Sequence, residues 1–394
     1  GVRAPLQTIK PTITPIIWTT IATGKMPEDH GVQSVVAKDP ETGKISPLTS
    51  ENIKAKPIWE ILSDRGEDVT VVRWPVTWPA SEVNGELVSD FAFQDSRTRR
   101  VWPESLEALV NARQVHSRLK DIQSLTGVDA ETYQNLDPVW QWKLMVLLRE
   151  YVLDVQFKDI AKTLFEQRQR TFSAVYFYSL DALGHNYYRF LNADTREDAP
   201  NFTDLVMNWC WLYDQFLKEI LSSVEENTHV VICSDHGMEL ALKPQNFLIM
   251  SEDSPPRSGD EPREVDLPPA PPYSADPFAV KLQYTAPSGQ HVNKPDGVFI
   301  MAGPMIEPGK RTAPLKITEI APTLLYLLGQ PVADDFADAP RLDLFKPDFR
   351  STHPVKRIAS FEGVSKELNR EDSREYKQED DLLLNRLEAL GYIK

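Results

Sequence analysis

Five side chains that can bind a divalent metal fall in three short segments of the sequence. They are Asp181 and His185 in Asp-Ala-Leu-Gly-His, Asp235 and His236 in Ser-Asp-His-Gly, and His291 in Gly-Gln-His. Carboxylate oxygens and imidazole nitrogens are common zinc ligands. The chain has seven histidines, and three of them fall in these segments. Each segment alone is typical of an ordinary loop, but together they predict a metal site.

A threonine at the start of a predicted helix is the candidate nucleophile. We expect Thr14 to cap the helix and Pro15 to take its first position, where a proline is well tolerated. Gly24 would end the helix. The Thr14 hydroxyl would then face free backbone N–H groups and the positive end of the helix dipole, which favour a bound phosphate. A purely structural cap explains the same residues, so the catalytic interpretation depends on the metal segments.

Apolar strands alternate with amphipathic helices along the chain. Strands are expected at 69–74, 174–178, 229–233 and 298–301. Helices are expected at 15–22, 57–62, 103–115, 140–169, 202–224 and 317–328. Asp181 and Asp235 follow predicted strands and His291 precedes one, which is where open α/β sheets build their sites. The pattern predicts an α/β fold with a mainly parallel sheet sandwiched by helices.

Two stretches interrupt this alternation. Residues 100–170 are helical without an obvious strand, so we interpret them as a helical cap inserted into the sheet domain. Residues 251–277 are dense in Pro, Asp and Glu, which favours an extended loop. We expect residues 1–394 to form a single domain that carries both insertions. Residues 379–390 are predicted to form a short amphipathic helix on its surface.

The composition limits the partners of the chain. A formal charge of −15 argues against a nucleic-acid polymer or an anionic lipid surface. A small anionic substrate is compatible with this charge, because bound cations can reverse the electrostatic field inside a cleft. No apolar run reaches the roughly 18 residues that a membrane span needs. Cys210 and Cys233 are interpreted as buried free thiols rather than a disulfide. Two free thiols are compatible with both an exported and a cytoplasmic protein. The sequence also leaves the oligomeric state undecided.

In this order, the motifs resemble those of the alkaline phosphatase superfamily, in particular its type I phosphodiesterase/nucleotide pyrophosphatase branch. Residues 12–32 are similar to the nucleophile region of that branch, with Thr14 at the nucleophile position. The metal-ligand motifs of the branch match Asp181, His185, Asp235, His236 and His291. The resemblance therefore implies an alkaline phosphatase-like fold.

The resemblance also implies two Zn²⁺ ions, and other divalent metals are alternatives at the same site. It assigns Asp181, His185 and His291 to one ion. It assigns Asp235 and His236 to the other, together with an aspartate at the end of a strand upstream of Thr14. Residues 1–13 contain no Asp or Glu. We therefore expect that aspartate and the first strand of the domain to be missing from a truncated N-terminus.

The implied activity is hydrolysis of a small phosphate ester, in which Thr14 attacks phosphorus and water then cleaves the phospho-threonine. Threonine at this position favours a phosphodiesterase or nucleotide pyrophosphatase. A phosphomonoesterase, a phosphonate hydrolase or a phospho-headgroup transferase of the same superfamily are the enzymatic alternatives. A non-catalytic descendant that binds a phosphate ligand or a partner is the alternative from another class.

Other residues near the motifs have open or structural interpretations. Lys25 and Lys294 are the basic residues of the motif segments, with orientations that the sequence leaves undecided. Trp74 and Trp78 would either flank a flat leaving group or pack at a strand end. His30 is interpreted as fixing a turn.

Overall fold

The structure is a computed structural model of the 394-residue chain. It describes residues 1–38, 43, 45–93, 98–114, 119–136, 138–191, 202, 204–240, 289–291, 293 and 295–362. The predicted loop at 251–277 and the predicted helix at 379–390 lie outside these residues. So does Lys294.

One of the two larger sheets has five strands in the order β12-β1-β11-β8, with β13 also beside β1. Its strands are β1 (Val2–Gln7), β8 (Val230–Cys233), β11 (Gly297–Ala302), β12 (Lys310–Arg311) and β13 (Leu315–Lys316). β12 and β13 are parallel to β1, whereas β11 runs antiparallel to both β1 and β8. The strand β1 was not predicted, and it leads directly toward Thr14.

The other larger sheet has four strands in the order β6-β5-β4-β7. They are β4 (Val69–Val72), β5 (Gly85–Val88), β6 (Val101–Trp102) and β7 (Phe172–Val175). β4 is parallel to both neighbours, as expected for a strand that is buried on all sides. Three pairs of short strands complete the described pairing: β2 (Val36–Lys38) with β3 (Ile45–Pro47), β9 (Glu239–Leu240) with β10 (Gly289–Gln290), and β14 (Val332–Ala333) with β15 (Arg357–Ile358).

Helices lie on both sides of these sheets. The α-helices are α1 (Thr14–Thr23), α2 (Pro27–His30), α3 (Ile58–Asp64), α4 (Glu107–Arg113), α5 (Gln123–Thr126), α6 (Ala130–Gln134), α7 (Pro138–Gln167), α8 (Ser179–Tyr187), α9 (Leu205–Leu221), α10 (Ile320–Leu327) and α11 (Pro347–Thr352). Short 3₁₀ turns cover Ser50–Asn52, Glu104–Leu106, Leu119–Asp121, Tyr188–Leu191, Ile317–Glu319 and Leu342–Leu344.

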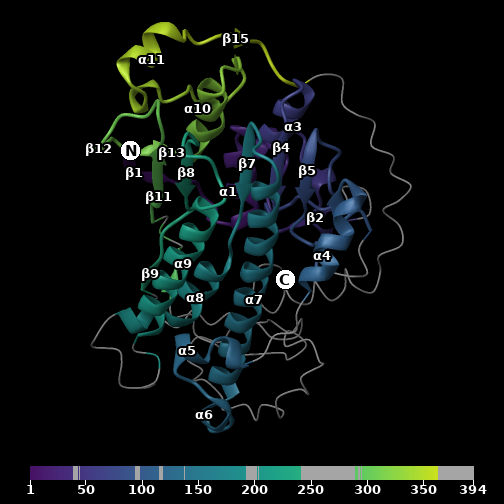
Figure 1. Ribbon diagram of the computed structural model, residues 1–394, viewed down its shortest axis with the longest axis vertical. Coiled ribbons are helices and arrows are strands. Elements are labelled where there is room, and N and C mark those ends of the chain that lie inside the picture. Colours follow the sequence, from purple (N-terminus) through teal and green to yellow (C-terminus); the bar gives the residue numbers. More distant parts are fainter. Residues whose placement is uncertain are drawn as a thin grey trace.

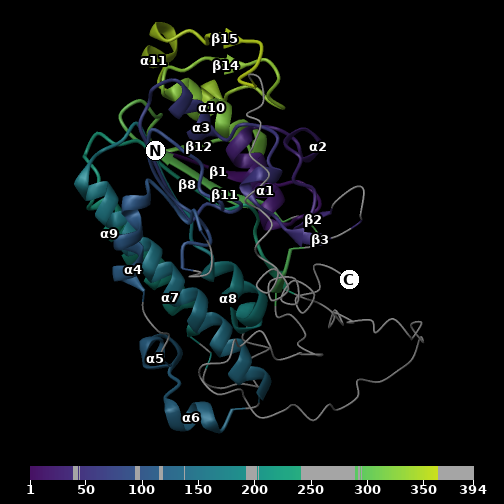
Figure 2. The same ribbon diagram turned by 90° about the vertical axis from the view of Figure 1, so that its right-hand side faces the viewer.

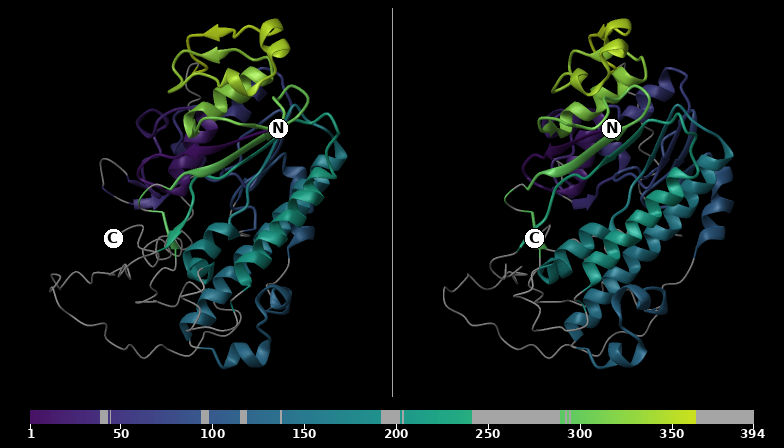
Figure 3. Two further views of the ribbon diagram at one scale, coloured as in Figure 1. Left: turned by 90° about the vertical axis from the view of Figure 1, so that its left-hand side faces the viewer. Right: turned by 60° about the vertical axis from the view of Figure 1, so that its left-hand side comes forward.

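The helices form two layers around the strands. α1 and α10 pack together on one side, and α7, α8 and α9 pack together on the other (Figure 3). α7 is the longest of the described helices. One of its ends packs on β4 and β7, and the other extends toward α5 and α6 (Figure 1). α11 and the β14–β15 pair lie at the opposite end of the molecule from α5 and α6 (Figure 2).

Separate hydrophobic clusters stabilise these layers. One combines residues of both larger sheets with residues of α1, α3 and α10. Another joins α5, α7, α8 and α9 through large side chains such as Trp209, Tyr187 and Phe202. The predicted α/β class is therefore confirmed. The division into one domain with a cap at 100–170 stays an interpretation, since α7 contributes to both the sheet layer and the helical cluster.

The structure corrects several details of the sequence analysis. Apolar residues continue to Tyr178, but the strand predicted at 174–178 covers Phe172–Val175, with one further backbone bond from the Tyr176 N–H to the Val72 carbonyl. The chain then turns into α8, so Asp181 and His185 lie on a helix instead of a loop. Cys210 is exposed, because the face of α9 that carries it points away from the packed helices. Both cysteines are free thiols, as predicted. No described helix is long and apolar enough to span a bilayer.

The corner between α1 and α2 depends on His30, which is fully buried. Its Nδ1 accepts a hydrogen bond from the Val32 N–H at 3.2 Å, so its Nε2–H donates to Thr20 Oγ1 at 3.0 Å. Burial lowers the pKa of His30 to about 4, against smaller opposing effects of its own backbone and Asp29. His30 therefore fixes the turn as a neutral side chain.

Acidification should destabilise this corner. The pKa of His30 is about 4 in the folded chain and near 6.5 in the unfolded chain, so the unfolded chain binds more protons between these values. The stabilisation is complete above pH 6.5 and is lost as the pH falls toward 4, by at most about 3 kcal/mol. Urea unfolding at pH 7.5, 6, 5 and 4.5 should show a flatter pH dependence for His30→Gln than for the parent. His353→Gln, at an exposed position, should follow the parent. Equal slopes for His30→Gln and the parent would contradict a neutral buried His30.

Candidate functional site

The strand directions bring the three predicted metal segments to one edge of the five-stranded sheet. β8 ends just before Asp235 and His236, and β11 begins six residues after His291. Because the two strands are antiparallel, the end of β8 and the start of β11 lie side by side. The short β9–β10 pair then ties the segment of His291 to the chain that follows His236.

The five predicted ligands form one cluster. Asp181 Oδ1 lies 3.6 Å from His185 Nε2 and 3.7 Å from His236 Nε2. His236 Nε2 is 3.4 Å from Asp235 Oδ2, and His291 Nε2 is 3.1 Å from His185 Nε2. The rings of His236 and His291 stack with centroids 4.0 Å apart. Asp181, His236 and His291 each offer a ligand atom within 4.8 Å of the others. This trio combines residues that the resemblance assigns to different ions.

Hydrogen bonds to backbone carbonyls orient two of the imidazoles. His185 Nδ1 lies 3.2 Å from the Gly289 carbonyl oxygen, and His236 Nδ1 lies 2.9 Å from that of Gly237. A carbonyl can only accept, so both Nδ1 atoms carry hydrogen and both Nε2 lone pairs face the cluster. Histidines that bind metals are commonly held in this way by a backbone carbonyl.

Two polar atoms at the centre of the cluster lack a hydrogen bond. Asp181 Oδ1 and His236 Nε2 are buried, and neither has a hydrogen-bond partner among the described residues. Buried polar atoms are nearly always paired, so an unpaired acceptor calls for an explanation. A carboxylate oxygen and an imidazole lone pair 3.7 Å apart fit a cation between them.

Burial and mutual charge shift the protonation of these groups. Burial raises the pKa of Asp235 to about 6, and the nearby Asp181 adds to this while His236 opposes it. Burial and the neighbouring His236 lower the pKa of His291 to about 4. Burial also acts to raise the pKa of Asp181, but the surrounding histidines outweigh it and the net shift is downward. His291 is thus neutral near pH 7, the state in which an imidazole binds a metal.

Glycines allow the ligand segments to touch. A Cβ on Gly289 would lie 2.5 Å from the Gly184 carbonyl oxygen and 2.8 Å from Tyr188 Cβ. A Cβ on Gly184 would lie 2.4 Å from Met238 Cε. Real Cβ contacts do not reach these distances, but the end of the flexible Met238 side chain could move aside. The close approach of β10 to α8 therefore depends on Gly289, which lies against the backbone of Gly184.

Thr14 is the first residue of α1, and the capping position belongs to Ile13. The prediction that Thr14 itself caps the helix was wrong by one residue, and no side chain caps α1. The Thr14 side chain is therefore not used for capping. A backbone hydrogen bond with Thr12 connects His291 to the segment that enters α1. This contact joins the segment of Thr14 to the ligand cluster.

Two tyrosines after β7 are part of the site, although they were not predicted from the sequence. The Tyr178 side chain hydrogen-bonds to Asp181 and helps to lower the pKa of that carboxyl. Burial and the charge of Asp235 raise the pKa of Tyr176 well above its usual value. Both tyrosines lie at the end of a predicted strand, just before Asp181, and this position could have identified them as site residues.

Other residues near the motifs have structural roles. Lys25 lies past the C-terminal end of α1, about 15 Å along the helix from Thr14, and pairs with Asp335 at 2.7 Å. Trp74 and Trp78 are buried, with their Nε1–H groups donating to backbone carbonyls. The packing interpretation of both tryptophans is therefore correct.

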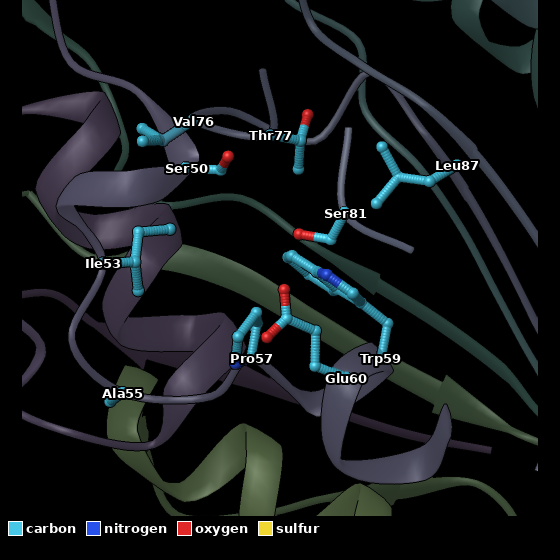
Figure 4. A pocket seen from close by; sticks show the side chains of 10 residues that line it. All are labelled: Ser50, Ile53, Ala55, Pro57, Trp59, Glu60, Val76, Thr77, Ser81 and Leu87. Carbon is cyan, nitrogen blue, oxygen red and sulfur yellow. The ribbon is translucent and has the colours of Figure 1, made fainter. Parts of the chain in front are cut away.

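A small pocket lies elsewhere, between α3 and the segments around Ser50 and Thr77 (Figure 4). Its volume of about 30 Å³ has room for roughly one or two water molecules. None of the predicted catalytic or metal-binding residues lines it. The ligand cluster at the sheet edge is therefore the candidate site.

Several known proteins are similar to this chain. Ectonucleotide pyrophosphatase/phosphodiesterase 1 of Saccharomyces cerevisiae is 27% identical over 245 residues, which is 59% of this chain and 28% of that protein. The chain thus spans about a quarter of the length of this relative. Human ectonucleotide pyrophosphatase/phosphodiesterase 5 is 15% identical with a TM-score of 0.49, over 88% of this chain and 92% of that one. Phosphonoacetate hydrolase from Sinorhizobium meliloti is 18% identical with a TM-score of 0.35, over 60% and 48%.

The family model described as type I phosphodiesterase / nucleotide pyrophosphatase matches residues 1–257, which is more than half of the chain. The match includes Thr14 and four of the five candidate ligands, and His291 lies beyond it. This chain belongs to the type I phosphodiesterase / nucleotide pyrophosphatase family, as the resemblance of its motifs implied.

Proposed function

We propose that the chain is a metal-dependent hydrolase of phosphate esters, acting as a phosphodiesterase or nucleotide pyrophosphatase through a phospho-threonine at Thr14. The observation that carries this proposal is the buried pair of Asp181 Oδ1 and His236 Nε2, which lacks hydrogen-bond partners among the described residues. These atoms lie among three further ligands, and backbone carbonyls orient two of the imidazoles. Family membership supports the substrate class.

The cluster has enough ligands for more than one ion. In the proposed division, Asp181, His185 and His291 hold one zinc, and Asp235 and His236 contribute to a second. When bound, the metal would neutralise phosphate charge and lower the pKa of a hydroxyl or water beside it. The two Nδ1–H bonds to carbonyls orient the imidazoles of His185 and His236, whose Nε2 atoms would then hold the ions.

The second ion would need at least one further ligand, because Asp235 and His236 alone are fewer than the three or four protein ligands of known zinc sites.

The residues of this chain would act on phosphorus as follows. A new bond forms between Thr14 Oγ1 and phosphorus while the bond to the leaving oxygen breaks, and the hydroxyl proton is lost. The leaving oxygen departs with the bonding electrons and takes up a proton. Free N–H groups in the first turn of α1 would donate to the phosphoryl oxygens. Water then cleaves the phospho-threonine and restores the hydroxyl.

The environment of Lys25 favours a diester over a monoester. A monoester is a dianion near neutral pH, and its binding benefits from an added basic side chain. Lys25 is the basic residue of the described motif segments, and it is held by Asp335 at the far end of α1. A phosphomonoesterase is therefore the second candidate. A phosphonate hydrolase, a phospho-headgroup transferase and a non-catalytic binding protein are further alternatives.

Thr14→Ala should abolish turnover of a chromogenic phosphodiester by the zinc-loaded protein. Removal of the attacking oxygen should lower kcat by about 1,000-fold or more, since no other group can form the intermediate. Thr14→Ser retains a hydroxyl and should keep activity within about tenfold. Turnover rates on the matching monoester distinguish a phosphodiesterase from a phosphomonoesterase. Undiminished activity in Thr14→Ala would exclude this nucleophile, and a zinc-loaded parent without turnover on either ester would favour a binding protein.

Gly289→Ala should weaken zinc binding. The added methyl group would overlap the Gly184 carbonyl, so β10 must move away from α8 and carry His291 away from His185. Displaced ligands should cost about 10- to 100-fold in zinc affinity, measured by competition with a chelator. Gly66→Ala is the control: its φ of +83° also makes alanine unfavourable, but its surroundings are open and lie at the end of α3. Equal zinc affinity in Gly289→Ala and the parent would refute the role of this close approach.

A further inference from the structure

A buried ion network lies where β4 and β7 end. Arg73 directly follows β4, and its side chain is 7% exposed. Its Nη1–H group donates to Asp154 Oδ1, and its Nη2–H group donates to Glu150 Oε2 at 3.0 Å. Asp154 and Glu150 both belong to α7, and their side chains are 0% and 3% exposed. The network therefore attaches α7 to the end of β4.

Asp154 also caps the helix that carries two of the proposed ligands. Its Oδ1 accepts the Tyr178 N–H at 3.0 Å, and its Oδ2 accepts the Ser179 N–H at 3.0 Å. These are the capping residue and the first residue of α8, and the side chain of Tyr178 makes no capping bond of its own. A carboxylate at a helix N-terminus satisfies free N–H groups and complements the helix dipole. Here the cap comes from a different helix.

α9 completes the surroundings of the Asp154 carboxylate. The Tyr213 hydroxyl donates to Asp154 Oδ2 and lies 3.1 Å from Ser179 Oγ. Trp209 Nε1–H donates to the same Ser179 oxygen at 2.9 Å. Asp154 therefore accepts hydrogen bonds from the end of β4, from the start of α8 and from α9 at once.

The backbone at Arg73 also indicates that this arrangement is tightly constrained. Arg73 has a φ of 59°, which is uncommon for a residue other than glycine. Its N–H bonds to the Val88 carbonyl at 2.8 Å, and its guanidinium lies 4.9 Å from the centre of the Phe157 ring. Unfavourable φ values persist where the surroundings fix them, and they cluster near functional sites.

We infer that Asp154 is a positioning residue of the metal centre: it fixes the first turn of α8 and thereby the Asp181 carboxylate. Asp181 lies two residues beyond Ser179 in that turn, and its N–H bonds to the Tyr178 carbonyl at 3.0 Å. Buried ion networks are weak sources of stability, because desolvation offsets much of their attraction. Their attested benefit is a specified geometry. The inference rests on the metal centre of the proposed function.

The same sheet contains a matched control at its other end. Asp68, just before β4, accepts the Thr171 N–H at 2.9 Å and pairs with Arg170. It thus resembles Asp154 in joining β4 and β7 through an arginine and a backbone N–H. It lies where these parallel strands begin, whereas the cluster lies beyond the end of β7. Loss of Asp68 should affect folding without moving α8.

The test compares Asp154→Asn and Asp68→Asn in the full chain. Zinc affinity is measured by chelator competition, and the visible spectrum of the Co²⁺-loaded protein reports ligand geometry without turnover. Asp154→Asn should lose about 10- to 100-fold in zinc affinity and change the Co²⁺ spectrum, and kcat should fall more than KM rises. Asp68→Asn should keep zinc affinity within about twofold at equal folded fraction, as judged by urea unfolding.

Tyr213→Phe provides a milder variant that keeps the test valid if Asp154→Asn does not fold. It removes one hydrogen bond to Asp154 and should shift the Co²⁺ spectrum in the same direction with a smaller loss of zinc affinity. If Asp154→Asn folds, a zinc affinity and a Co²⁺ spectrum equal to those of the parent would overturn the inference. If Asp154→Asn does not fold, a Tyr213→Phe variant with the affinity and spectrum of the parent would overturn it. An equal loss of affinity in Asp68→Asn would overturn it too. Failure of the parent itself to bind zinc would instead refute the metal centre.

Discussion

The reversal of β11 between β1 and β8 is the constraint on which the candidate site depends. Leu6 near the end of β1 pairs with Gly297 at the start of β11, and Cys233 at the end of β8 pairs with Phe299. The chain therefore leaves β1 and β8 and enters β11 at the same edge. The approach to α1, the Asp-His pair and the late histidine meet there. In a fully parallel sheet, the segment before β11 would lie at the opposite edge.

Once these segments meet, close packing and burial determine their chemistry. The Gly184 carbonyl lies so close to Gly289 that a Cβ there would be 2.5 Å from its oxygen. Burial favours neutral imidazoles and raises the cost of carboxylates that have no cation beside them. The opposing pKa shifts of Asp235 and His291 follow from this. A bound cation, as proposed, would pair with the acceptor atoms that lack partners among the described residues and would offset the repulsion between the carboxylates.

α8 is held at both ends by residues distant in sequence. At its N-terminus, Asp154 accepts two backbone N–H groups while paired with Arg73. Near its C-terminus, the His185 ring donates to the Gly289 carbonyl. Positions between these two anchors have little freedom to move, and Asp181 is one of them. This arrangement suits a ligand helix, because a metal site tolerates only small displacements of its donors.

The sequence by itself determined several of the elements and the candidate chemistry. Apolar periodicity located α1, α3, β4, α7, β8 and β11, because burial of one face imposes it locally. The motifs of Thr14, Asp181 and His236 identified the family, since their residue types and order are local properties. Only the tertiary structure decided the direction of β11, the burial of Trp74 and the capping of α8 by Asp154. Each of these depends on contacts between segments far apart in the chain, and the periodicity of a strand is the same whichever way its neighbour runs.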